Sequence, residues 1–292
     1  MLIFLAAQVF RGLCMGAADV VPGVSGGTIA LVLGIYERLV ATVRQGSASL
    51  AYAARLDGKT AYRRLRQVDW FFIIPLLLGI FAAIVIVARP IQHLLEERPA
   101  EMAAAFFGLV VASIGIAWEG LRTRDARRLG VMIAVGAATF WALGLRTGQE
   151  QDPALLFVFA AGLVAVCAMI LPGISGAFIL LMLGLYDFII DAVNDRDLLV
   201  LGVFGVGCVV GLASFSSLLH ALLRRYHDTV LAALIGLMLG SLRVLWPWPE
   251  GVESTVLGEP SWNEVPLALL VGIGAAVVVV ALTRWSRGIS TR

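Results

Sequence analysis

The chain has 292 residues, of which 60% are hydrophobic and only 14% are charged. An ordinary soluble domain carries roughly 25% charged residues. This composition excludes a disordered chain, which needs low hydrophobicity and high charge, and a soluble enzyme, because 292 residues cannot hide this much apolar surface from water. It indicates an all-α polytopic membrane protein, to which a formal net charge of +2 adds little.

Apolar segments that are long enough, or nearly long enough, to cross a membrane follow one another along the chain. The first is expected to be a retained segment and not a cleaved signal, because it has no basic start and no small-residue cleavage site. Pro-Gly-rich breaks separate two pairs of short arms, the first pair at 2–18 and 28–43 and the second at 154–171 and 177–190. The remaining expected spans are 70–88, 102–118, 129–145, 198–219, 230–245 and 266–283.

The loops between these segments differ in the sign of their charge. The net basic loops are 44–69, 119–128, 220–228 and the tail from 284, and the net acidic loops are 89–101, 146–153, 191–197 and 243–265. Basic loops face the cytoplasm, so both ends of the chain are predicted on the cytoplasmic side of the membrane. All the basic loops lie on one side of the membrane, and all the acidic loops on the other, only if each break returns the chain to the side from which it came. Each break is therefore predicted to be a hairpin, and arms of about 16 residues, about 24 Å long, favour a re-entrant loop over two full crossings of a core of about 30 Å.

An internal repeat relates the two halves of the sequence. Residues 16–40 align with 166–190 at an offset of 150, and the offset then falls to 128, which matches Gly79 with Gly207 and Gly108 with Gly236. Each half is a hairpin plus three spans, an odd number of crossings. We therefore predict an inverted-topology repeat, as in many secondary transporters, with a first repeat over 1–148 and a second, inverted one over 149–292 in one membrane domain. A duplication that only stabilises the fold is the alternative.

The two matched Pro-Gly-x-Ser-Gly loops are the predicted substrate site. Proline ends one helix, glycine permits close approach of the backbone, and Ser25 or Thr28 can cap the next helix. The free N–H groups at such a helix start bind anions, phosphate above all, and two loops from opposite sides are predicted to meet around one phosphate. A tightly packed turn without a ligand is the alternative. The predicted phosphate-binding residues are Arg11, Gly23, Ser25, Gly26, Gly27, Thr28, Gly173, Ser175 and Gly176.

Ionisable residues inside the apolar segments are costly and usually functional. Arg11 is predicted to neutralise a phosphate or to pair with Asp19 or Glu37, with snorkelling to the interface as the alternative. Asp19, Glu37 and Asp187 are candidates for proton coupling. Glu37 and Asp187 each follow a matched tyrosine, and a plain interfacial location is the alternative for both.

The sequence lacks the motifs of catalysis and of metal binding. Its three cysteines form no CxxC pair, so we expect no disulfide, metal or cofactor. There is no HExxH and no GxSxG, and Ser25 and Ser175 have no nearby histidine base, so they are predicted to be ligands or caps and the chain is predicted not to be an enzyme. Nothing in it points to nucleic acid as a partner.

At its two loops the sequence resembles the DUF368 family of bacterial membrane proteins. The resemblance is carried by GAADVVPGVSGGT at 16–28, GIYE at 34–37, LPGISG at 171–176 and Gly184-Leu185-Tyr186. Members of this family are polyprenyl-phosphate transporters. The resemblance implies that the protein flips undecaprenyl phosphate from the outer to the inner leaflet of the cytoplasmic membrane, where this lipid carrier is reused for peptidoglycan synthesis.

Other readings of the residues stay open beside this one. Helix N-termini at the midplane suit an anion channel or a small-anion transporter as well as a lipid flippase. A lipid-phosphate enzyme would need a nucleophile and a base together, and a structural partner of a cell-wall enzyme would need a docking surface that the short loops do not offer. Membrane lipids are expected partners, and glycine-rich helix faces permit a homodimer.

Overall fold

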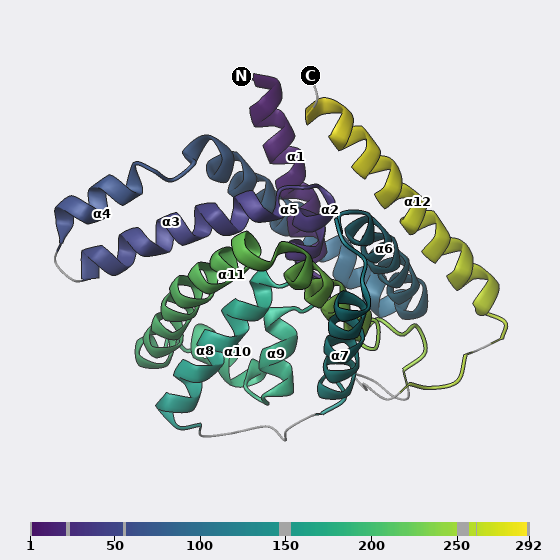
Figure 1. Cartoon of the computed structure of the whole chain (residues 1–292). Coiled ribbons are helices and arrows are strands. Elements are labelled where there is room, and N and C mark those ends of the chain that lie inside the picture. Colours follow the sequence, from purple (N-terminus) through teal and green to yellow (C-terminus); the bar gives the residue numbers. More distant parts are fainter. Residues whose placement is uncertain are drawn as a thin grey trace.

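The structure is a computed structural model that describes residues 2–21, 24–54, 57–145, 153–249, 257–260 and 262–290 (Figure 1). Twelve helices follow one another in these residues: α1 Leu2–Asp19, α2 Gly26–Val32, α3 Tyr36–Ala54, α4 Gly58–Leu65, α5 Trp70–Glu97, α6 Pro99–Glu119, α7 Ala126–Ala142, α8 Leu155–Ile170, α9 Gly176–Met182, α10 Tyr186–Asn194, α11 Leu198–Ser241 and α12 Val265–Ser290. The part of the chain so described has no β-pairing beyond a single bridge between Pro249 and Leu257. The predicted all-α class is confirmed.

Four of these helices, α5, α6, α11 and α12, are long and apolar enough to cross a membrane. A fifth candidate arises if α9 and α10, which are bent by 109°, count as one broken span. Aspartates cap the N-termini of four helices: Asp57 accepts a hydrogen bond from Thr60, Asp69 from Phe72, Asp125 from Arg128 and Asp197 from Leu199 and Val200. The N–H of Arg128 lowers the pKa of Asp125 in this way. The chain is thus a multi-pass membrane protein.

The helices differ from the predicted segments mainly in the loops between them. The expected spans 198–219 and 230–245 form the two parts of α11, which meet at a kink where Tyr226 has non-helical backbone angles (φ −134°, ψ 44°). This kink lies in the predicted loop 220–228, which includes no proline or glycine and is otherwise helical. The basic loop 44–69 is likewise largely helical, because α3 runs to Ala54 and α4 follows.

The second arm of each predicted hairpin is itself broken. Gly34 (φ 70°) follows the seven-residue helix α2, and Gly184 (φ 68°) follows the seven-residue helix α9. Glycine adopts this left-handed conformation without penalty, so it ends a helix and redirects the chain. The two arms therefore each contain a short helix and then a turn, at matching places in the two halves.

Helix contacts recur at matching positions of the two halves. Helix α1 packs on α5, and α8 packs on the first part of α11. A Cβ added at Gly12 would overlap the carbonyl oxygen of Leu76, and one at Gly162 would overlap that of Phe204. In the sequence repeat, Gly12 matches Gly162 at the offset of 150, and Leu76 matches Phe204 at the offset of 128. Helix α6 packs on α12, as the second part of α11 packs on α7, so that elements of one half interlock with elements of the other.

One of the closest glycine contacts gives a test of the packing. A Cβ at Gly108 of α6 would overlap the backbone of Gly272 on α12, whereas one at Gly115 of the same helix meets open space. We expect Gly108→Leu to force the helices apart and to destabilise the fold by about 1–3 kcal/mol or more. The melting temperature in detergent measures this. Gly115→Leu is the matched control, and equal melting of the two variants would contradict the contact.

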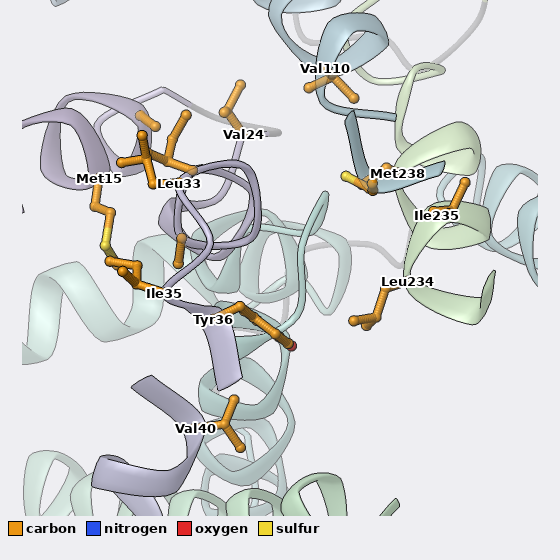
Figure 2. Packing of buried hydrophobic residues seen from close by; sticks show 14 of the residues in the cluster. Met15, Val24, Leu33, Ile35, Tyr36, Val40, Val110, Leu234, Ile235 and Met238 are labelled. Carbon is orange, nitrogen blue, oxygen red and sulfur yellow. The ribbon is translucent and has the colours of Figure 1, made fainter. Parts of the chain in front are cut away.

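The largest hydrophobic core joins both halves. It brings residues of α1, α2 and α3 together with residues of α5, α6 and α11. Figure 2 shows Met15 and Leu33 on one side of this region and Val110 and Met238 on the other. The two Pro-Gly loops lie against this core, so their geometry is set by contacts from both halves.

Candidate functional site

The two Pro-Gly-x-Ser-Gly loops are in contact inside the protein. The N–H of Gly173 donates a hydrogen bond of 2.8 Å to Oγ1 of Thr28, which is fully buried. The hydroxyl of Ser25, also buried, lies 3.4 Å from the carbonyl oxygen of Met169 at the end of α8. Gly27 has no room for a side chain, because a Cβ would lie 2.8 Å from the carbonyl oxygen of Ile170. Residues 25–28 of one half and 169–173 of the other thus form one junction.

The start of α2 is fully hydrogen bonded within this junction. Ser25 accepts from the N–H of Gly27 at 3.0 Å, and its carbonyl oxygen accepts from the N–H of Thr28 at 2.9 Å. The N–H of Gly26 donates to Oδ1 of Asp19 at 2.6 Å, a short distance that is typical of a bond to a carboxylate. The carboxylate of Asp19 therefore occupies the place at which an anionic ligand would meet the backbone of α2.

The second loop also places a serine at the start of a short helix, but its side chains make different contacts. Ser175 occupies the N-cap position of α9 and is buried, but its side chain makes no capping hydrogen bond. Gly173 has φ +87°, and a Cβ there would lie 2.9 Å from Cα of Met238 and from Oγ of Ser241. Met169 stands at the position that matches Asp19. The junction therefore has a carboxylate on one side only.

The other predicted site residues lie in different surroundings. Gly23, with Pro22, falls outside the described residues. Arg11 lies eight positions before Asp19, about 12 Å along α1, and donates to Oε1 of Gln8 at 3.4 Å and to Oγ of Ser286 at 3.1 Å. These contacts join Arg11 to its own helix and to α12, and its role as a phosphate ligand stays a prediction. Asp187 is exposed in the first turn of α10.

Glu37 takes part in a network that sequence reasoning missed. Its Oε1 lies 3.0 Å from Nε2 of His227, and Nδ1 of His227 lies 3.0 Å from Oδ1 of Asp228. Asp228 in turn accepts from the N–H of Thr123 at 3.0 Å and from its hydroxyl. These residues come from the start of α3, the kink of α11 and the turn before α7, and no spacing in the sequence connects them. Among the residues that the structure describes, no group of three or more His, Cys, Asp or Glu side chains could hold a metal ion.

Two apolar cavities flank the junction. One, of about 310 Å³, lies between α1, α2, α6 and α12 and reaches Ala18 and Ile29 beside the first loop. The other, of about 500 Å³, lies between α7 and the two parts of α11 and reaches Leu171 beside the second loop. Three residues that line the first cavity match three that line the second at the repeat offset of 128. They are Ile91 with Leu219, Phe106 with Leu234, and Leu109 with Leu237.

Long apolar helices, with broken helices that meet inside the protein beside apolar cavities, define a membrane transport protein. Residues 15–259 match the undecaprenyl phosphate translocase-like family, and the chain belongs to this family. It is 42% identical to a polyprenyl-phosphate transporter of Vibrio cholerae over 88% of this chain and 82% of the relative. It is 27% identical to a polyprenyl-phosphate transporter of Staphylococcus aureus over 82% of this chain and 86% of the relative. No solved structure matches the chain.

Proposed function

We propose that the protein moves undecaprenyl phosphate from the outer to the inner leaflet of the bacterial cytoplasmic membrane and so returns the lipid carrier to cell-wall synthesis. The phosphate is held by the two Pro-Gly-x-Ser-Gly loops. The observation that carries this proposal is the contact between Thr28 and Gly173, because it brings backbone donors and hydroxyl groups of both loops to one place. The names of the relatives, polyprenyl-phosphate transporters, supply the class of substrate.

The cavities beside the junction favour a lipid over a small anion. Each is lined mainly by apolar side chains and lies next to one of the loops, and the wall of the second also includes Arg127 and Thr229. A phosphate on an isoprenoid tail needs a polar place for its headgroup and an apolar path for its tail, and the two features are adjacent here. A small anion would gain nothing from apolar walls.

We infer that the two halves, 1–148 and 149–292, are an inverted-topology repeat with re-entrant hairpins and with both chain ends on the cytoplasmic side. The matching glycine contacts of α1 with α5 and of α8 with α11 support the repeat, and the charge of the loops supports the orientation. Ser25 and Thr28 are buried where the two halves meet. Rocking one half against the other breaks the Thr28–Gly173 hydrogen bond and exposes the phosphate to one leaflet at a time.

Asp19 can couple the transport of the lipid to the movement of protons. Its carboxylate holds the N–H of Gly26, which an incoming phosphate also needs. Two anions do not share one donor, so the phosphate enters when Asp19 is protonated or withdrawn, and it leaves when the carboxylate returns. Glu37 and Asp187 are the other candidates for this role.

Leaflet transfer of labelled polyprenyl phosphate in liposomes tests the proposal. We expect the double variant Ser25→Ala with Ser175→Ala to lower the rate at least tenfold, because both loops lose a hydroxyl ligand and α2 loses its cap. Ser214→Ala is the matched control, since this serine of α11 bonds only to carbonyl groups of its own helix in the described contacts. If the double variant transferred lipid as fast as the wild type, the loops would not be the phosphate site. A wild type that passes chloride and moves no lipid would make the protein an anion channel.

A further inference from the structure

We infer that Gln8, Arg11 and Ser286 form a second phosphate site, at which the headgroup of a polyprenyl phosphate is held while its tail lies in the cavity between α1, α2, α6 and α12. The identity of the lipid rests on the proposed function. The existence of the site rests on the chemistry of three polar side chains at the contact of α1 with α12, where the ends of these two helices come together (Figure 1).

The three side chains present hydrogen-bond donors, two of them buried and that of Arg11 partly exposed. Gln8 is fully buried and Ser286 is 6% exposed. Arginine is a donor only, so Gln8 must turn its amide oxygen toward Arg11, and the contact of 3.4 Å fits this. The NH₂ group of Gln8 is then left without an acceptor among the described residues. A buried donor without an acceptor costs about 1–3 kcal/mol, and a phosphate oxygen beside a guanidinium would satisfy it.

The repeat shows that the fold does not need these polar groups. The positions that match Gln8 and Arg11 in the second half are Val158 and Ala161, which are both buried. Helix α8 nevertheless packs on α11 through the same glycine contacts by which α1 packs on α5. Since apolar residues serve the packing at the equivalent place, the glutamine and the arginine are best explained by a ligand.

The cavity of about 310 Å³ extends from beside the first loop to within about one helical turn of this cluster. Its wall includes Cys14, one turn after Arg11 on α1, and Leu282, one turn before Ser286 on α12. The same wall reaches Ala18 and Ile29 beside the junction. A volume near 300 Å³ is the lower end of the range for ligand pockets, and an apolar lining suits a stretch of isoprenoid chain. A headgroup at Arg11 therefore has its tail already lying along the path to the Ser25 loop.

Equilibrium binding to the full-length protein in nanodiscs tests the site. The probes are labelled polyprenyl phosphate, the uncharged polyprenol and inorganic phosphate. The variants Gln8→Val and Arg11→Ala install apolar residues like those of the second half, and Ala275→Phe fills the cavity from α12. We expect each to weaken binding of polyprenyl phosphate at least fivefold and polyprenol to bind weakly throughout. Ala281→Phe, on an exposed position of α12, is the control.

The melting temperature of each variant and its leaflet transfer complete the test. We expect Gln8→Val to melt at or above the wild type, because it removes an unsatisfied donor, so weaker binding cannot be ascribed to misfolding. Binding within twofold of the wild type in both Gln8→Val and Arg11→Ala would overturn the second site, and so would inorganic phosphate binding as tightly as the lipid. A wild type that binds the lipid here but transfers none would instead count against the proposed function and leave the site in place.

Discussion

Gly173→Ala is expected to abolish lipid transfer and to destabilise the protein by about 2–4 kcal/mol. Two costs act together at this position. The backbone has φ +87°, which a residue with a side chain adopts only at a penalty of about 1–2 kcal/mol, and the new Cβ would lie 2.9 Å from Cα of Met238. Relief of this overlap moves the second loop, and with it the N–H group that donates to Thr28.

Gly34→Ala separates the cost of the left-handed backbone from the cost of the Cβ overlap. Gly34 has φ +70°, but a Cβ there meets no atom within 4 Å, so only the backbone penalty applies. We expect a loss of about 1–2 kcal/mol with lipid transfer retained. Thermal melting in detergent and leaflet transfer in liposomes measure the two variants side by side. If Gly173→Ala transferred lipid as fast as Gly34→Ala, close packing of the second loop against α11 would not be needed for transport.

The sequence predicted the helical class and most helix positions, because apolar length and charged ends mark helices without any tertiary information. It failed where a break depends on one residue. The predicted loop 220–228 is only a kink at Tyr226 between the two helical parts of α11, since it holds no proline or glycine that would break the helices further. Conversely, Gly34 and Gly184 lie inside apolar arms that were predicted to be continuous, and each takes a left-handed conformation that ends a short helix.

The candidate site was predictable only in part, because its loops are sequence motifs whereas the contacts of single side chains are not. Two matched Pro-Gly-x-Ser-Gly loops are visible in the sequence, and the structure brings Thr28 and Gly173 into contact. The partners of Arg11 and Glu37 were not predictable. Their contacts with Ser286 and His227 depend on how far each helix is rotated about its axis, and a helix that is apolar on most sides carries little record of that rotation. Gln8 alone left a signal, since its spacing of three from Arg11 places both on one face of α1.

Asp19→Asn is expected to make lipid transfer insensitive to an imposed pH gradient and to slow it at least tenfold, while polyprenyl phosphate binds more tightly. The amide oxygen of asparagine can still accept from the N–H of Gly26, so the shape of the loop is kept. Hydrogen bonds to a charged group contribute about 1.5–3 kcal/mol, against about 0.5–1.5 kcal/mol for neutral partners, so the phosphate displaces the amide more easily than the carboxylate. With no carboxylate to return, release of the phosphate loses its driving step.

Glu37→Gln is the matched control for this experiment, because Glu37 is also an acid near the start of a helix but faces His227. Transfer is measured in liposomes with and without a pH gradient, and binding is measured on the same preparations. We expect Glu37→Gln to keep its response to the gradient. If Asp19→Asn still responded to the gradient and Glu37→Gln did not, the proton would travel through the contact of α3 with the kink of α11. The carboxylate of Asp19 would then be a structural cap of α2, with no part in the coupling.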